Sequence, residues 1–333
     1  MRPTKPLSTT SVVVLQKILT TRTSDSILCT FNVLWEVGVL VDDFREALNN
    51  RRILVFDGAT GTQLAARGSQ PGSMATLLSP DIVYEVHVAY REAGADILLT
   101  NTLTANRIYL KHAGQEDKFE ELNRAAVELC RKAAGDECYV CGDMGPTGQF
   151  LEPYGEYTEQ QFYENASEQA RLLMEAGVDF IIIETMTCVR EAAISAQAAK
   201  EATGLPVIAC VSFDAAGGGF RTMMGDTVEK AVQELSNAGV DVIGTNCGTV
   251  DPVEISEIVA RMRALTDLPL AAEPNAGKPE LTKGQVVFSL DPERFAEGVL
   301  KCVEAGATLV GGCCGTTPDH IRSLVARLTR RQS

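Results

Sequence analysis

Apolar positions along most of the chain recur with two periods, and segments of the two kinds alternate. Residues 80–92 and 227–237 place apolar side chains three and four positions apart, which is typical of an amphipathic helix. Ala-Gly and a short β-branched run come next, as in AGVDFIIIET (176–185). Glycine suits the left-handed residue that ends a helix, and the apolar run predicts a strand buried on both faces.

Helix, Ala-Gly and strand follow one another in this way four times, and four further apolar runs lie between the repeats. The repeats are AGADILLTNT (93–102), AGVDFIIIET (176–185), AGVDVIGTNC (238–247) and AGATLVGGCC (305–314). The other runs are RILVFDGATG (52–61), YVCGDMGPTG (139–148), PVIACVSFD (206–214) and PLAAEPNAGKP (269–279). Together they predict strands that begin near residues 53, 96, 139, 179, 207, 241, 270 and 308.

Eight strand–helix units over residues 42–333 predict one α/β domain, a (β/α)8 TIM barrel. An open doubly wound sheet would also alternate strands and helices. The turn after the first strand, GATGTQ, lacks the G-x-G-x-x-G pattern of dinucleotide-binding sheets, and eight near-equal units favour closure. Residues 1–41 form an N-terminal extension of undetermined order. Its first 24 residues hold basic but no acidic side chains, so it is either a targeting segment or an added stretch.

Composition and charge narrow the class of protein. With 45% hydrophobic and 22% charged residues, the chain is expected to fold around a large core. A formal net charge of −14 disfavours nucleic acid and anionic membrane surfaces as partners. No apolar stretch reaches the roughly 20 residues of a spanning helix. Ten cysteines without the spacing of a disulfide framework indicate reduced thiols and a cytoplasmic protein.

Polar and thiol side chains stand where four of the predicted strands end. The seventh and eighth residues after the repeat glycines are Asn101–Thr102, Glu184–Thr185, Asn246–Cys247 and Cys313–Cys314. Because TIM barrels carry their chemistry at the carboxyl ends of the strands, Cys247, Cys313 and Cys314 are expected to converge there. Cys247 and Cys313 have opposite strand parity, so a bulge or an early loop must turn one of them inward.

Three thiolates around one ion with an open fourth position are typical of catalytic zinc, and soft sulfur ligands select zinc over magnesium or calcium. Buried structural thiols or a vicinal disulfide are the alternative for adjacent cysteines, but the glycines of GGCCG leave room for a metal. A three-thiolate zinc site carries net negative charge and makes a poor hydroxide source. It suits a thiol substrate held as thiolate, which indicates alkyl transfer to sulfur.

The motifs DGATGTQL, TNT, GDMGPTG, DFIIIET, GTNCG, EPNAGKP and GGCCGTTPDHI, in this order, resemble the homocysteine S-methyltransferase family over about residues 42–328. GDMGPTG and EPNAGKP are similar, more narrowly, to the homocysteine-binding module of cobalamin-dependent methionine synthase. The resemblance implies a zinc barrel with Cys247, Cys313 and Cys314 as ligands. It also implies zinc-dependent methyl transfer to the thiol of L-homocysteine, which gives L-methionine.

A free amino-acid substrate needs partners for its ammonium and its carboxylate group. Asp57 and Glu184 stand at strand ends, match positions of the family, and are expected to accept the ammonium; surface carboxylates near a loop are the alternative. The turn from Gly58 to Gly61, with Thr60, opens a helix whose backbone N–H groups suit the carboxylate. A tight glycine turn without a ligand is equally compatible with this sequence.

Two asparagines are expected to support the metal. Asn275, at the end of the seventh predicted strand, is a candidate for a weak fourth zinc ligand that an incoming thiolate displaces, with loop capping as the alternative. Asn246 is expected to orient Cys247 or the substrate. His320 is expected to have no catalytic role. Met223 and Met224, beyond the glycine-rich segment 214–220, are expected to pack against the protein.

The expected methyl donor is methylcobalamin on a separate corrinoid protein or module, because the chain holds neither a second barrel nor a D-x-H-x-x-G cobalamin motif. S-methylmethionine or S-adenosylmethionine is the alternative donor. A hypothesis of another class is a subunit that binds zinc and homocysteine but has no turnover alone.

Overall fold

The computed structural model describes residues 43–50, 52–282 and 285–332. The extension predicted for residues 1–41, and residue 42 at the predicted start of the barrel, lie outside the described residues. The proposed boundary between these two parts therefore stays a prediction.

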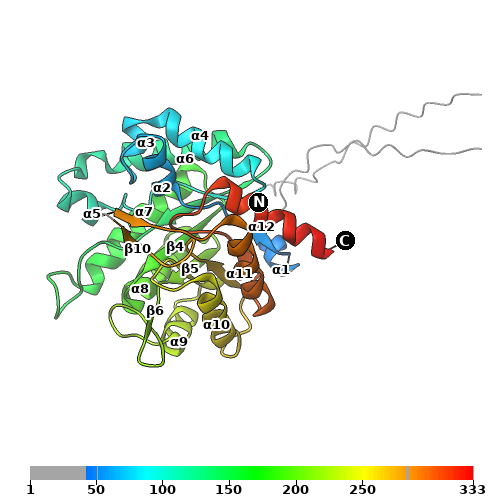
Figure 1. The fold of residues 1–333 in the computed structure, drawn as a ribbon. Coiled ribbons are helices and arrows are strands. Elements are labelled where there is room, and N and C mark those ends of the chain that lie inside the picture. Colours follow the sequence, from blue (N-terminus) through cyan, green and yellow to red (C-terminus); the bar gives the residue numbers. More distant parts are fainter. Residues whose placement is uncertain (1–42, 51, 283–284, 333) are drawn as a thin grey trace, which may run out of the picture. The chain divides into compact units, whose positions relative to one another are not determined.

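Eight parallel strands form one sheet that closes on itself (Figure 1). They are β1 (Leu54–Val55), β2 (Ile97–Leu99), β3 (Tyr139–Met144), β4 (Phe180–Met186), β5 (Val207–Val211), β8 (Val242–Asn246), β9 (Leu270–Glu273) and β12 (Leu309–Val310). The order is β1-β12-β9-β8-β5-β4-β3-β2. β1 and β2 meet where Phe56 bridges Ile97 and the Asp96 N–H donates to the Val55 carbonyl over 2.7 Å. The predicted TIM barrel is confirmed, and each predicted strand start lies within one residue of the observed one.

Helices surround the strands, and two small hairpins extend the loops (Figure 1). The helices are α1 (Phe44–Asn49), α2 (Thr60–Ala66), α3 (Ala75–Leu78), α4 (Pro80–Glu92), α5 (Arg107–His112), the 3-10 turn η1 (Glu116–Lys118), α6 (Phe119–Ala134), α7 (Glu159–Ala176), α8 (Val189–Thr203), α9 (Val228–Asn237), α10 (Pro252–Arg263), α11 (Pro292–Glu304) and α12 (Pro318–Gln332). The hairpins pair β6 (Asp214–Ala216) with β7 (Gly219–Arg221) and β10 (Glu280–Thr282) with β11 (Gln285–Val287). No helix among the described residues is long and apolar enough to cross a membrane.

The Ala-Gly repeats end helices as the sequence predicted. Gly94, Gly177, Gly239 and Gly306 have φ between +78° and +111°, a region that side chains disfavour. The clearest case is α7, which begins at a capping box made by Thr158 and Gln161 and ends at Gly177. Each stop turns the chain back into the next strand, so the repeat sets the spacing of the barrel.

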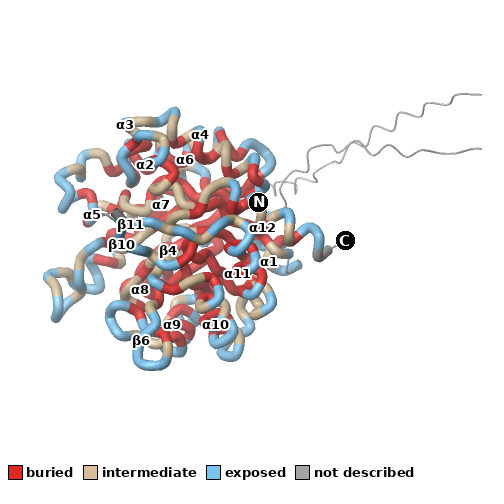
Figure 2. Tube along the Cα trace, in the orientation of Figure 1, coloured by how far each residue is buried: buried red, intermediate tan, exposed pale blue. Residues whose placement is uncertain are grey.

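Two apolar layers hold the barrel together, one inside the sheet and one between the sheet and the helices. Figure 2 shows the buried residues concentrated in the interior and the exposed residues on the outer helices and loops. On β4, Phe180 and Ile182 belong to the inner layer, whereas Ile181 and Ile183 face the helices. All four side chains are fully buried. This alternation continues along the strand and turns Glu184 toward the barrel axis.

The amino end of the barrel is closed by α1, which the sequence did not predict. The ring of Phe44 stacks on Phe180 with centroids 3.6 Å apart and meets Tyr139 edge-on at 5.5 Å. α1 thus seals the inner apolar layer from one side.

Aspartates of three Ala-Gly repeats organise the same end of the sheet. Asp96, Asp179 and Asp241 each accept the backbone N–H of the neighbouring strand's first residues, at Val55, Val140 and Val207, over 2.7–2.9 Å. Their ion-pair partners are, in the same order, Arg52, Arg131 and Lys200. Every one of these acids has both an N–H donor and a cation.

The glycine-rich segment after β5 is a hairpin, with Gly217 and Gly218 at positive φ in its turn. Met223 and Met224 follow it, and the prediction that they pack is wrong, because their side chains are 63% and 38% exposed. Backbone hydrogen bonds between Thr222 and Asp226 and from Gly225 to Thr222 close a tight turn here. The turn buries Thr222 and leaves the two methionines in solvent.

Candidate metal centre and substrate site

Three cysteines from two distant segments meet at the carboxyl end of the barrel. The sulfur atoms of Cys247, Cys313 and Cys314 lie within 4.8 Å of one another, and those of Cys247 and Cys314 are 3.9 Å apart. β8 ends at Asn246, and Cys247 adopts a φ of +58°. This left-handed residue is the early turn that the opposite strand parity of Cys247 and Cys313 requires.

The donor set fits a zinc ion. Zn–S bonds of about 2.3 Å place tetrahedral sulfur ligands about 3.8 Å apart, which matches the separation of Cys247 and Cys314. The Asn275 side-chain N–H donates to the Gly248 carbonyl over 2.8 Å, and its buried Oδ1 has no hydrogen-bond partner among the described residues. An uncommitted amide oxygen suits a weak, displaceable ligand, and that role of Asn275 stays a prediction.

The cysteines share protons unequally without a metal. Hydrogen bonds from Cys247 and Cys313 lower the pKa of Cys314 to about 4. Hydrogen bonds to Cys247 and Cys314 raise the pKa of Cys313. The cluster therefore holds one thiolate readily, and a divalent cation must displace protons from the other two thiols.

Glycines before the cysteine pair let the last strand approach its neighbours. A Cβ atom at Gly311 would lie 2.5 Å from the Cβ of Phe56, and one at Gly312 would lie 2.6 Å from Thr316. Both separations are shorter than van der Waals contact allows. GGCCG therefore brings the cysteines close to the end of the first strand.

Four buried carboxyl groups lie near the thiols, and no described basic side chain forms an ion pair with any of them. Asp57, Asp143, Glu184 and Glu273 are each at most 8% exposed. Burial raises the pKa of all four, that of Glu184 to about 7, and repulsion from Glu184 adds to the effect on Asp57, Asp143 and Glu273. Such a cluster is electrostatically suited to a cationic ligand.

Asn246 connects the carboxyl groups to the cysteines. Its side-chain nitrogen donates to Glu184 Oε2 and to Thr185 Oγ1, and lies 3.9 Å from the sulfur of Cys313. Its Oδ1 accepts the backbone N–H of Thr185 over 2.9 Å. Asn246 is fully buried, so this one side chain sets the spacing between the carboxylate and thiol parts of the site.

Thr185 and Cys247 share an unusual backbone conformation, each with φ of +58°. For a β-branched residue such as Thr185 this is a genuine outlier, and such residues cost about 1–3 kcal/mol. Both hydrogen bonds of Thr185 to Asn246 compensate for this strain. Strained residues at the ends of β4 and β8 direct side chains that regular strands would turn away.

Asp57 and the turn after it lie at the end of β1. Asp57 Oδ2 accepts the backbone N–H of Leu99 over 3.0 Å. A Cβ at Gly58 would lie 2.6 Å from Thr316 Oγ1, which explains why a glycine is required there. The Ala59 N–H already donates to Thr316 Oγ1, whereas the first turn of α2, with Thr60 and Gly61, has no side-chain cap. Its N–H groups remain available to a carboxylate.

Asp143 and Glu273 were not predicted as site residues, although they lie in the motifs GDMGPTG and EPNAGKP. Each is an acidic residue at an inward-facing position near the end of an apolar strand. This position is the feature of the sequence that could have identified them as site residues. Asn101 is bound elsewhere, since it donates to Gly72 and to Thr76. His320 bonds to Thr317 and to the Leu290 carbonyl, as a structural residue would.

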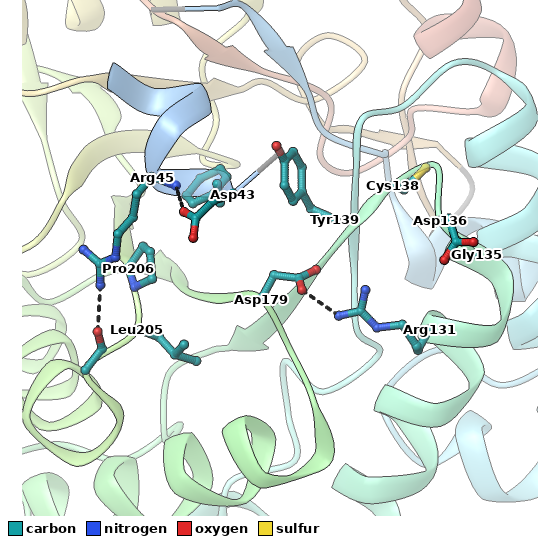
Figure 3. A pocket seen from close by; sticks show the side chains of 12 residues that line it. Asp43, Arg45, Arg131, Gly135, Asp136, Cys138, Tyr139, Asp179, Leu205 and Pro206 are labelled. Atoms are coloured by element: carbon teal, nitrogen blue, oxygen red, sulfur yellow. Dashed lines mark hydrogen bonds and ion pairs between the residues drawn. The ribbon is translucent and has the colours of Figure 1, made fainter. Parts of the chain in front are cut away.

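One cavity lies at the end of the barrel opposite to the cysteines. Its volume is about 450 Å³, and it lies at the amino ends of β3, β4 and β5, beside α1 (Figure 3). The ion pair of Arg131 with Asp179 crosses its wall. Because barrel chemistry belongs to the opposite end, we assign no catalytic role to this cavity.

Comparisons with known proteins find relatives of one family. The family model described as homocysteine S-methyltransferase matches residues 54–328. Methionine synthase from Mycobacterium leprae is 32% identical over 84% of the chain, and that from Mycobacterium tuberculosis is 33% identical over 83%. The chain spans about a quarter of the length of these relatives, 24% and 25% respectively.

A solved structure shares both fold and sequence. The homocysteine methyltransferase MmuM from Escherichia coli, in its metallated form, superimposes with a TM-score of 0.71 and 26% identity, over 86% of this chain and 100% of the other. The family match extends from β1 into α12 and includes all three cysteines. The chain therefore belongs to the homocysteine S-methyltransferase family.

Proposed function

We propose that this protein transfers a methyl group to the thiol of L-homocysteine, giving L-methionine, with zinc bound by Cys247, Cys313 and Cys314. The observation that carries the proposal is the meeting of these three sulfur atoms within 4.8 Å of one another beside a buried carboxyl cluster. The three cysteine thiols suit a zinc ion that binds the substrate's sulfur, and the buried carboxylates suit its ammonium group. Membership of the homocysteine S-methyltransferase family supports methyl transfer as the reaction.

Each part of the site has a role in this reaction. The zinc ion, when bound, stabilises the substrate sulfur as a nucleophilic thiolate at neutral pH. The cysteines would hold the ion, and Asn275 would supply a weak fourth ligand. The thiolate attacks the electrophilic methyl carbon, the new S–CH₃ bond forms, and the bonding pair of the broken bond leaves with the donor.

The carboxyl groups and the α2 turn bind the amino-acid end of the substrate. Glu184 and Asp57 accept hydrogen bonds from the ammonium group, whose positive charge offsets their buried negative charge. N–H groups of the turn between Gly58 and Gly61, including Thr60, receive the carboxylate. Asn246 holds Glu184 at a set distance from the cysteines, so the ammonium end and the thiol end of the substrate would be recognised together.

The donor we propose is methylcobalamin on a separate corrinoid protein or module. Support comes from the methionine synthase relatives, of which the chain matches only about a quarter, so most of their length is available for other tasks. The nine described cysteines are free thiols, which fits a reducing compartment, and we place the reaction in the cytoplasm.

A small sulfonium compound, S-methylmethionine or S-adenosylmethionine, is the second candidate donor. This chain matches the whole length of MmuM, which is named a homocysteine methyltransferase although it consists of a barrel of this size alone. That match favours a small-molecule donor.

The test is to offer the zinc-loaded protein L-homocysteine with methylcobalamin, S-methylmethionine and S-adenosylmethionine in parallel, and to measure methionine by mass spectrometry. Cys314→Ala is the matched control. Methionine formed from methylcobalamin would support the proposed donor. Methionine formed only from a sulfonium compound would show that this compound is the donor instead. Zinc and homocysteine binding without methionine from any donor would indicate a subunit that needs a partner. Full activity in zinc-free protein would overturn the proposal.

A further inference from the structure

Asp143 lies directly beside Glu184 inside the barrel. On β3 it follows Tyr139 and Cys141 in the row of side chains that face the barrel axis. Its backbone N–H donates to Thr100 Oγ1 over 3.0 Å, and its carbonyl accepts from Thr102 Oγ1 over 2.6 Å. The side chain is 5% exposed, so the neighbouring strand holds it in a rigid, dry place.

The Asp143 carboxyl group lacks an ordinary hydrogen-bond donor. No N–H or O–H group of the described residues donates to its side-chain oxygens, and its buried Oδ1 is without a partner. The group that faces it is the carboxyl of Glu184, which turns toward the barrel axis from the adjoining strand β4, where Asp143 pairs with Ile182. Glu184 acts on the pKa of Asp143 as a repelling charge and as a hydrogen-bond partner. Two ionised carboxylates only repel each other, so this contact is a hydrogen bond only when one of the two groups carries a proton.

The surroundings decide which group carries that proton. Glu184 Oε2 accepts the side-chain N–H of Asn246, and Thr185 Oγ1 lies 3.5 Å away, whereas Asp143 receives no such donor. These bonds favour the charge on Glu184. Burial, followed by repulsion from Glu184, raises the pKa of Asp143. Burial, followed by repulsion from Cys247, raises the pKa of Glu184 to about 7, and the hydrogen bond from Asp143 opposes this rise.

We propose that Asp143 is a positioning residue of the substrate site: as a neutral acid it donates a hydrogen bond to Glu184 and holds that carboxylate, ionised, toward the α-ammonium group of the substrate. The inference rests on the proposed role of Glu184 in homocysteine binding. It makes Asp143 a determinant of specificity for thiols that carry an amino group, although it does not touch the substrate.

The experiment compares two ligands and three variants in the zinc-loaded full chain. The ligands are L-homocysteine and 4-mercaptobutanoate, which lacks the amino group. The variants are Asp143→Asn, which keeps an N–H donor toward Glu184, and Asp143→Ala and Asp143→Leu, which do not. Dissociation constants come from calorimetry, and zinc content and melting temperature are measured for every variant.

We expect the two apolar variants to bind homocysteine about 10-fold more weakly, the effect of one lost hydrogen bond to a charged group, and to bind 4-mercaptobutanoate within twofold of the wild type. Asp143→Asn should stay within threefold for both ligands. The difference between the infrared spectra of the wild type and of Asp143→Asn should contain the band of one protonated carboxyl group, lost in the variant.

Three results would overturn the inference. Equal losses for both ligands would show a merely structural role. A loss in Asp143→Asn as large as in Asp143→Ala would show that the charge of Asp143 is itself needed. Unchanged binding in the apolar variants would show that Asp143 has no part in recognition. Failure of the proposed function looks different, because the wild type would then bind neither ligand through its zinc.

Discussion

The two ends of the barrel treat acidic groups in opposite ways. At the amino end, Asp96, Asp179 and Asp241 each bond to a strand N–H and to a basic side chain. At the carboxyl end, Asp57, Asp143, Glu184 and Glu273 are more deeply buried and form no ion pair with a described basic side chain. The comparison separates acids whose charge the fold compensates from acids whose charge it leaves uncompensated.

Backbone geometry follows the same division. At the amino end the ring of Phe44 stacks on Phe180. The carboxyl end has two non-glycine residues, Thr185 and Cys247, at positive φ. Strain and uncompensated charge both lower stability, and proteins keep them where function needs them. Substitutions of acidic residues at the two ends should therefore change the free energy of unfolding in opposite directions and by different amounts.

The largest expected effect comes from the cysteines. Cys314→Ala should abolish tight zinc binding and lower methyl transfer by about 1,000-fold or more, because the metal stabilises the nucleophile by several kcal/mol. Cys138→Ala, at the amino end, is the control and should keep both. Zinc content and initial rates are the measurements, and a Cys314→Ala protein that retains zinc and activity would refute the assigned centre.

Phe44→Ala should have the second-largest effect, on stability alone. Loss of a buried ring stacked on Phe180 should lower the free energy of unfolding by about 3 kcal/mol, measured by urea denaturation. kcat/KM should stay within twofold. A changed KM for homocysteine would show that the two ends are coupled and would contradict the division drawn above.

Glu184→Gln should separate stability from binding. Burial raises the pKa of Glu184 to about 7 in the folded protein, so its contribution to stability is present below the unfolded pKa and is lost as pH rises through 7. The variant escapes this loss, and its unfolding free energy should rise by about 2 kcal/mol at pH 8 but hardly at pH 4.

The same variant should raise KM for homocysteine about 30-fold, since the ammonium group loses a charged partner. The matched variant at the amino end, Asp179→Asn, should instead lower stability and leave KM alone. If both variants shifted stability in the same direction at pH 8, the contrast between the ends would be wrong.

The smallest effect is expected for Arg131→Ala, which removes the partly exposed ion pair with Asp179. Such pairs contribute about 0.5 kcal/mol, and Asp179 keeps its N–H donor from Val140. Thermal melts at low and high salt should differ less for the variant than for the wild type. A loss above about 2 kcal/mol would mean that the cavity beside α1 depends on this pair.

Periodicity and composition were sufficient for the barrel and for the candidate ligands. Apolar runs mark the strands because those runs are buried on both faces, and Cys247 is brought to Cys313 and Cys314 because β8 and β12 belong to one closed sheet. α1 was not predicted, since a six-residue helix owes its place to Phe180, far along the chain. Asp143 was missed for a similar reason: its meaning depends on Glu184, on another strand, and on the absence of a donor.

Asn246 makes β4 and β8 interdependent. One amide group holds Thr185 in its left-handed turn and at the same time bonds Glu184 and approaches Cys313. Anyone who grafts this site onto another barrel must therefore transplant both strand ends as one unit, together with the asparagine between them. A graft of the cysteines alone would lack the asparagine that fixes the distance between the thiols and Glu184.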